Sequence, residues 1–168
     1  MAVDFVIYRW LVYAHILGVF VFLIAHGVSA GVGFRLAKER NRERVAALLD
    51  LSGSSYRVMT LGIWWILITG LILGSVGGWW TLTWFWAAIV VLLLLGGLMT
   101  PLATIPYNRI RAMLGLRTPM RRKQPPPAPS GTDEELSAAL AKISPIPSAA
   151  VGFVGLAVLL WLMIFKPF

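Results

Sequence analysis

The sequence contains no cysteine. This absence excludes a disulfide, a thiolate metal site and a cysteine nucleophile, so any metal must be held by histidine, methionine or oxygen. Charged residues are also scarce, at 13% of the 168 residues, whereas 58% are hydrophobic. That balance is far from the composition of a water-soluble domain. We therefore expect an integral membrane protein.

Charge is absent from long stretches of the chain. No charged residue occurs from Trp10 to Gly33, and a helix of this length covers the roughly 30 Å hydrocarbon core of a bilayer. Four such spans are predicted, at residues 10–33, 58–76, 82–104 and 149–165. We predict an all-α fold in which residues 1–168 form one transmembrane domain, a four-helix bundle of up-down-up-down topology.

The basic residues gather in the two long loops. Residues 34–57 hold six of the 15 Lys and Arg residues and residues 105–148 hold seven, whereas only Arg9 and Lys166 lie beyond the other ends of the spans. Basic loops stay in the cytoplasm, so both termini are predicted to lie outside it. The net charge of +8 is thereby explained by topology and by contact with the lipid bilayer, and no nucleic acid is expected.

Each loop is expected to contain an amphipathic cytoplasmic helix. In residues 34–57, interleaved charges are followed by apolar residues at helical spacing, which predicts a helix on the membrane surface that ends at Ser52 and Gly53. In the second loop, Thr132 and Glu135 form a capping box that opens a short helix. This helix is expected to reach about Ile143.

Prolines are expected to set the other boundaries. Pro101 and Pro106 should bend or end the third span. Residues 124–131, which read QPPPAPSG, are predicted to be a flexible linker. Pro145 and Pro147 should close the short helix before the fourth span begins at Ala149.

The only two histidines, His15 and His26, both lie in the first predicted span. Residues 11 positions apart point within about 20° of each other on an α-helix and lie roughly 16 Å apart along it. Small residues share their face, as on membrane helices that pack against neighbours. We therefore expect both imidazoles to point into the bundle, on either side of the midplane.

Imidazole inside a membrane indicates a functional site, and it is a common ligand of haem iron, copper and zinc. His15 and His26 are therefore candidate ligands of haem b or of a metal ion. Met59 is a candidate second ligand because it should lie at the depth of His26, as should Met99. His15 has no comparable partner, since Met163 should lie nearer the outer surface, and haem there would be five-coordinate or shared with a symmetry mate.

Two alternatives stay open for the histidines. In the first, each is a neutral side chain that hydrogen-bonds a Thr, a Ser or a backbone carbonyl on a neighbouring helix. In the second, the histidines handle protons or a substrate. Met59 and Met99 also have a packing alternative.

Acidic and basic residues are missing from the interior of all four predicted spans, which argues against proton-driven transport. The sequence also lacks a Ser-His-Asp set, a phosphate-binding glycine loop and a metalloprotease motif, so no catalytic residue is predicted. Glycine pairs allow close helix packing within the bundle, in a homo-oligomer or on other membrane subunits. These pairs are Gly27 and Gly31, Gly70 and Gly74, and Gly152 and Gly155.

A family resemblance rests on three segments between Tyr8 and Gly115. These are LVYAHILGVFVFLIAHGVSAGVGFRLAKER, VAALLDLSGSSYRVM and the GGWW turn. Together they resemble a family of four-span bacterial proteins described only as predicted integral membrane proteins of unknown function. More distantly, the first span is similar to copper-resistance protein D-type membrane proteins and to the small haem-binding protoporphyrinogen oxidase of bacteria. The resemblance implies the inner membrane of a bacterium, a four-helix bundle, and a haem or copper role for His15.

The chain departs from both distant patterns. It lacks the basic residue that the oxidase pattern has within a later span, and it lacks the additional Met or His ligands that copper import favours. The leading hypothesis is a non-enzymatic four-helix membrane protein, an accessory subunit of a larger complex, whose first-span histidines bind haem b or a metal. The alternatives are a membrane b-type cytochrome or redox enzyme, and a small-molecule or metal permease.

Overall fold

The computed structural model describes residues 5–119 and 125–167. Within these residues the regular structure is entirely helical, which confirms the all-α prediction. Four helical segments are long and apolar enough to cross a membrane, and they cover the four predicted spans. They are Phe5–Leu36, Arg42–Gly77, Thr83–Met113 and Pro145–Phe165. Gln124 of the predicted linker and three of the counted bases, at positions 121–123, lie outside the described residues.

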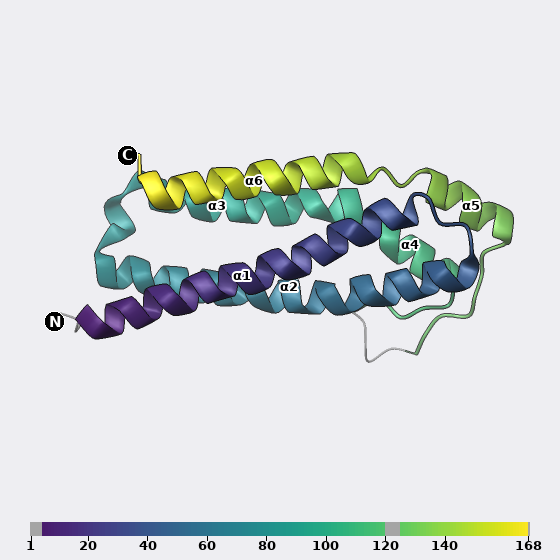
Figure 1. Ribbon diagram of the computed structural model, residues 1–168, viewed down its shortest axis with the longest axis horizontal. Helices are drawn as coiled ribbons and strands as arrows, with labels where there is room; N and C mark the ends of the chain where they lie inside the picture. Colours follow the sequence, from purple (N-terminus) through teal and green to yellow (C-terminus); the bar gives the residue numbers. More distant parts are fainter. Residues whose placement is uncertain (1–4, 120–124, 168) are drawn as a thin grey trace.

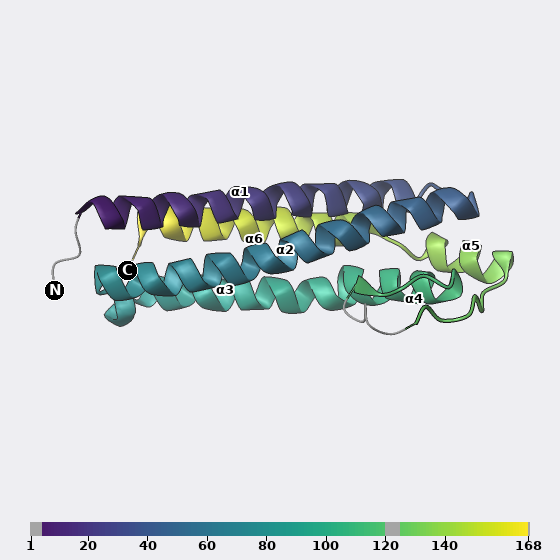
Figure 2. The same ribbon diagram turned by 90° about the horizontal axis from the view of Figure 1, so that it is seen from below.

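The helices form an elongated bundle (Figure 1). Its elements are α1 (Phe5–Leu36), α2 (Arg42–Gly77), η1 (Trp79–Thr81), α3 (Thr83–Met99), η2 (Thr100–Thr104), α4 (Ile105–Met113), α5 (Asp133–Ala141) and α6 (Pro145–Phe165). Figures 1 and 2 show that α1 runs beside α2 and that α3 runs beside α6. The start of α1 and the end of α6 lie at one end of the bundle. We call the other end, which holds α4, α5 and the α1–α2 turn, the loop end.

The prediction of a surface helix that ends at Ser52 and Gly53 is wrong. Asn41 caps α2 by accepting a hydrogen bond from the backbone of Arg44, at 3.0 Å, and the helix then continues to Gly77 without a break. The apolar residues near the start of α2 are fully buried in a cluster at the loop end. This packing stabilises the helix although Ser52 and Gly53 are weak helix formers. The cluster comprises Val32, Leu36, Val45, Leu49, Tyr107, Ile110, Leu136 and Leu140.

Pro101 and Pro106 do not end the third span. Residues Thr100–Thr104 form a π-helical turn, in which the backbone N–H of Ile105 donates to the carbonyl of Thr100. π-helical structure is rare and occurs mostly as single turns within α-helices, where the helix continues past the irregularity. The helical segment therefore continues to Met113, and the polar residues of α4 lie on an extension of the third span.

The predicted end of the short loop helix and the predicted start of the fourth span are also displaced. The capping box is confirmed: Thr132 accepts from the backbone N–H of Glu135 at 3.2 Å, and Glu135 accepts from that of Thr132 at 3.0 Å. However, α5 ends at Ala141 and α6 begins at Pro145. Proline suits the first turn of a helix because the N–H that it lacks has no helical partner there. Pro145 and Pro147 therefore open α6 rather than close α5.

The described part of the linker, residues 125–131, has no regular structure but lies against α4. The backbone N–H of Gly131 donates to the carbonyl of Met113 at 3.3 Å. Arg42 of α2 adds a bond to the Gly131 carbonyl at 3.4 Å and an ion pair with Asp133 at 2.9 Å. These contacts hold α2, α4 and α5 together at the loop end.

Candidate binding cavity at the loop end

His15 is hydrogen-bonded within the bundle. Its Nδ1 lies 2.8 Å from the hydroxyl oxygen of Thr69 on α2, and that hydroxyl lies 2.7 Å from the carbonyl of Trp65. Because the single hydroxyl proton is donated to Trp65, the hydroxyl oxygen accepts a hydrogen bond from Nδ1–H of the imidazole. This geometry matches the hydrogen-bonding alternative for His15. Metal or haem binding at His15 stays a prediction.

His26 faces a different neighbour. Its ring stacks on Phe22, with centroids 5.8 Å apart and planes 13° apart, and its Nε2 lies against Gly152 of α6. No hydrogen bond joins His26 to another described residue. The two histidines therefore share α1 but not one site, because His15 contacts α2 and His26 contacts α6.

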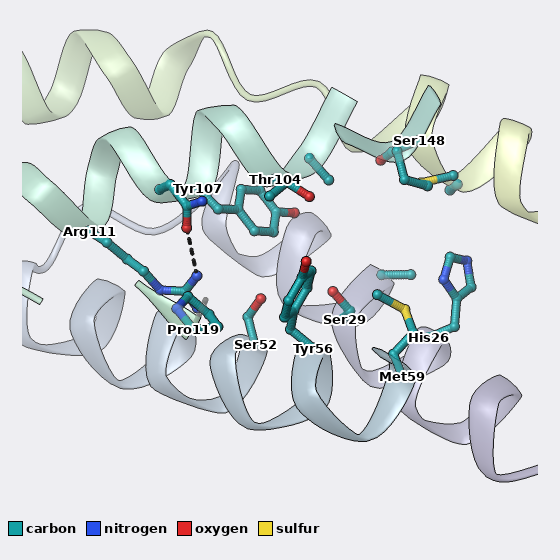
Figure 3. Close-up of a pocket in the computed structure, with 15 residues that line it drawn as sticks. His26, Ser29, Ser52, Tyr56, Met59, Thr104, Tyr107, Arg111, Pro119 and Ser148 are labelled. Carbon is teal, nitrogen blue, oxygen red and sulfur yellow. Dashed lines mark hydrogen bonds between the residues drawn. The ribbon is translucent and has the colours of Figure 1, made fainter. Parts of the chain in front are cut away.

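A cavity of about 60 Å³ lies beside His26 at the loop end (Figure 3), and its surface is mostly apolar with several polar side chains. All four long helical segments contribute to its wall. The lining residues are His26, Ser29, Ala30, Ser52, Tyr56, Met59, Met99, Ala103, Thr104, Tyr107, Asn108, Arg111, Pro119, Ser148 and Ala149. Figure 3 shows His26 and Met59 toward one end, which we call the histidine end, and Arg111 toward the opposite, arginine end.

Three candidate donors line the cavity. His26 comes from α1, Met59 from α2 and Met99 from α3. The sequence predicted both methionines at the depth of His26, and all three residues line this one cavity. An imidazole nitrogen and two thioether sulfurs form a donor set suited to a soft metal ion.

The cavity is smaller than a haem pocket. Pockets for ligands of that size hold roughly 300–1,000 Å³, whereas this cavity measures about 60 Å³. A volume of this size holds a few water-sized groups. Among residues 5–119 and 125–167, no group of three or more His, Cys, Asp and Glu side chains could hold a metal ion either. A metal ion at the histidine end would therefore rely on methionine sulfur.

The arginine end contains a buried cation. Arg111 is only 4% exposed, and its guanidinium donates to the carbonyl of Leu49 on α2 and, at 3.4 Å, to the side-chain oxygen of Asn108. No carboxylate of the described residues forms an ion pair with it. From the sequence, Arg111 is expected to be only a base of the second loop, because the third span is predicted to end before it. If the helix is predicted to continue past Pro106, the spacing of Arg111 from Tyr107 and Asn108 puts the three residues on one helix face.

Hydroxyl groups line the space between the two ends. Figure 3 shows Ser29, Ser52, Tyr56 and Tyr107 between His26 and Arg111. None of these hydroxyls forms a hydrogen bond with another described residue. No buried polar side-chain atom of the described residues lacks a hydrogen-bond partner, so these hydroxyl oxygens are accessible from the cavity rather than enclosed in the protein interior. They can therefore form hydrogen bonds with a polar occupant of the cavity.

Comparisons of the chain with protein-family models, with curated proteins and with solved structures found no match. The resemblance to four-span bacterial membrane proteins therefore stays a prediction.

Proposed function

We propose that this chain is a non-enzymatic integral membrane protein that binds one Cu(I) ion at the histidine end of the loop-end cavity. The supporting observation is that His26, Met59 and Met99, from three different helices, line one cavity. Thioether sulfur favours Cu(I), and neutral imidazole is a common copper ligand. The cavity volume suits an ion together with a small additional ligand.

We also propose that the protein lies in the inner membrane of a bacterium, with the loop end in the cytoplasm and both termini outside it. The distribution of basic residues supports this orientation: the loop end holds most of them, and Arg9 and Lys166 lie toward the other end. A periplasmic reporter fused after Phe168 should be active. Activity of a cytoplasmic reporter at the same position would reverse the orientation.

The bundle acts as an accessory subunit that packs against another membrane helix through α1. Gly27 and Gly31 support this assignment, because no atom lies within 4 Å of a Cβ built at either residue. The other predicted glycine pairs are covered inside the bundle: a Cβ at Gly70 would lie 3.4 Å from His15, and Gly155 packs against Leu95. Small residues four apart on an open helix face favour helix–helix association in lipid.

Copper binding is tested on the full chain purified in mild detergent under reducing conditions. After equilibration with Cu(I) and a competing chelator, we expect one copper per chain, with nitrogen and sulfur neighbours in the X-ray absorption spectrum. His26→Ala should remove most of the copper, and Met59→Leu should weaken retention. His15→Ala is the matched control on the same helix and should retain copper.

Equal copper retention by wild type and His26→Ala would overturn the assignment. The visible spectrum of the protein as isolated tests the haem alternative independently. A Soret band that disappears in His26→Ala would replace copper by haem b as the ligand, and would require the cavity to open.

A further inference from the structure

We propose that the arginine end of the same cavity binds a small oxyanion, a group with the chemistry of phosphate, sulfate or carboxylate, through the Arg111 guanidinium. The site does not depend on copper, because it uses residues at the opposite end of the cavity from His26 and Met59 (Figure 3).

The first argument is the state of the buried cation. Arg111 is 4% exposed and lies on α4, the extension of a membrane span. Burial of a charge is unfavourable unless the charge is paired and hydrogen-bonded. Asp50 attracts it electrostatically but lies beyond ion-pair distance, and the two hydrogen bonds to Leu49 and Asn108 leave other N–H groups of the guanidinium free to donate. A bound anion would compensate the charge directly.

The second argument is the set of neutral groups that line the same cavity. Ser52, Tyr56 and Tyr107 carry hydroxyls that have no hydrogen bond to another described residue, and the Tyr107 hydroxyl packs against Gly33 of α1. Ser52 and Tyr107 are themselves at least nine-tenths buried, at 4% and 7% exposed. A guanidinium together with several hydroxyl donors is the typical composition of a protein site for an oxyanion.

The third argument is size. A volume of about 60 Å³ suits an anionic group of a few heavy atoms, such as a phosphate. The loop end also holds most of the basic residues of a chain with a net charge of +8, so its electrostatic field attracts anions toward the cavity.

A structural role is the competing explanation, because Arg111 also ties α4 to the Leu49 carbonyl of α2. The two roles respond differently to Tyr56→Phe. This change removes a cavity hydroxyl but leaves the contact between Arg111 and Leu49 in place. A purely structural Arg111 predicts that Tyr56→Phe has no effect on anion binding.

The experiment measures binding of inorganic phosphate to the copper-free full chain in a neutral, phosphate-free detergent, by isothermal titration calorimetry. We expect saturable binding at one site per chain. Arg111→Gln should weaken it by at least about tenfold, and Tyr56→Phe by roughly three- to tenfold, as for the loss of one hydrogen bond. Arg44→Gln is the matched control, since it removes an exposed base of the loop end that does not line the cavity.

The oxyanion has two natural sources, a free anion or the phosphate of a lipid headgroup. Native mass spectrometry of protein released from membranes separates them, because a bound phospholipid adds a defined mass. Phospholipid retained by wild type and lost in both Arg111→Gln and Tyr56→Phe would assign the site to a headgroup. If wild type binds phosphate no better than Arg111→Gln and retains no phospholipid, the oxyanion site is refuted, whatever the copper result.

Discussion

The Nε2 atom of His26 lies so close to the backbone of Gly152 that one added carbon at residue 152 would overlap it. Gly152→Ala should therefore displace the imidazole from α6 and from its place on the cavity wall. We expect a loss of about 1–3 kcal/mol in stability, as for other overpacked sites, together with weaker Cu(I) binding. Chelator competition and thermal unfolding in detergent would measure the two effects.

The matched control is Gly96→Ala on α3. Gly96 is exposed, and no atom lies within 4 Å of a Cβ built there. This variant should leave copper binding unchanged and leave stability equal or slightly higher. Equal behaviour of the two variants would show that the His26–Gly152 contact does not position the imidazole.

The hydrogen bond between His15 and Thr69 should be structural only. Thr69→Val removes the hydroxyl that accepts from the imidazole while it keeps a side chain of similar size. We expect a loss of about 0.6 kcal/mol in stability, the average measured for such bonds between membrane helices, and no more than about 1.7 kcal/mol. Copper content should stay at the wild-type level. A copper content reduced as strongly as in His26→Ala would return His15 to the list of ligands.

The sequence predicted the four spans because each is a long run free of charge, and that signal survives any tertiary arrangement. It also predicted the capping box of Thr132 and Glu135, which is a local motif. The sequence did not predict the helix boundaries that depend on packing between distant segments. Ser52 and Gly53 would end an isolated helix, but the burial of Leu49 against α4 stabilises α2 across both residues.

The cavity was predictable only in part. Counting residues along each span predicts that Met59 and Met99 lie at the depth of His26, and these three residues do line the cavity. The sequence did not predict that the two histidines contact different helices. That difference arises because α1 packs on α2 near His15 and on α6 near His26. Arg111 was missed because the π turn that carries the helix past Pro101 and Pro106 has no simple sequence signature.

The turn between α1 and α2 should loosen in acid. Glu39 accepts hydrogen bonds from the backbone N–H groups of Asn41, at 3.0 Å, and of Arg40, at 2.9 Å, and these bonds lower its pKa from the ordinary 4.5. A lowered pKa in the folded state means that the stabilisation is present above about pH 4.5 and is lost as the pH falls through the lower, folded-state value.

The measurement for Glu39 is a pH titration of the amide signals of Arg40 and Asn41 by NMR in detergent micelles. Both signals should shift together with a midpoint below 4.5. Glu39→Gln is the control, and it should abolish the shift because its amide does not titrate. A midpoint at or above 4.5 in wild type would contradict the two hydrogen bonds.

Two neighbouring residues at the start of α5 should differ in importance. Asp133 forms the ion pair with Arg42, but its side chain is 89% exposed, so Asp133→Asn should cost no more than about 1 kcal/mol. Thr132→Ala removes the oxygen that accepts from the backbone of Glu135, a cap worth about 0.5–2 kcal/mol, and should fray the first turn of α5. Hydrogen exchange of the α5 amides should therefore rise more in Thr132→Ala than in Asp133→Asn. The reverse order would mean that the ion pair with α2, rather than the capping box, holds this helix at the loop end.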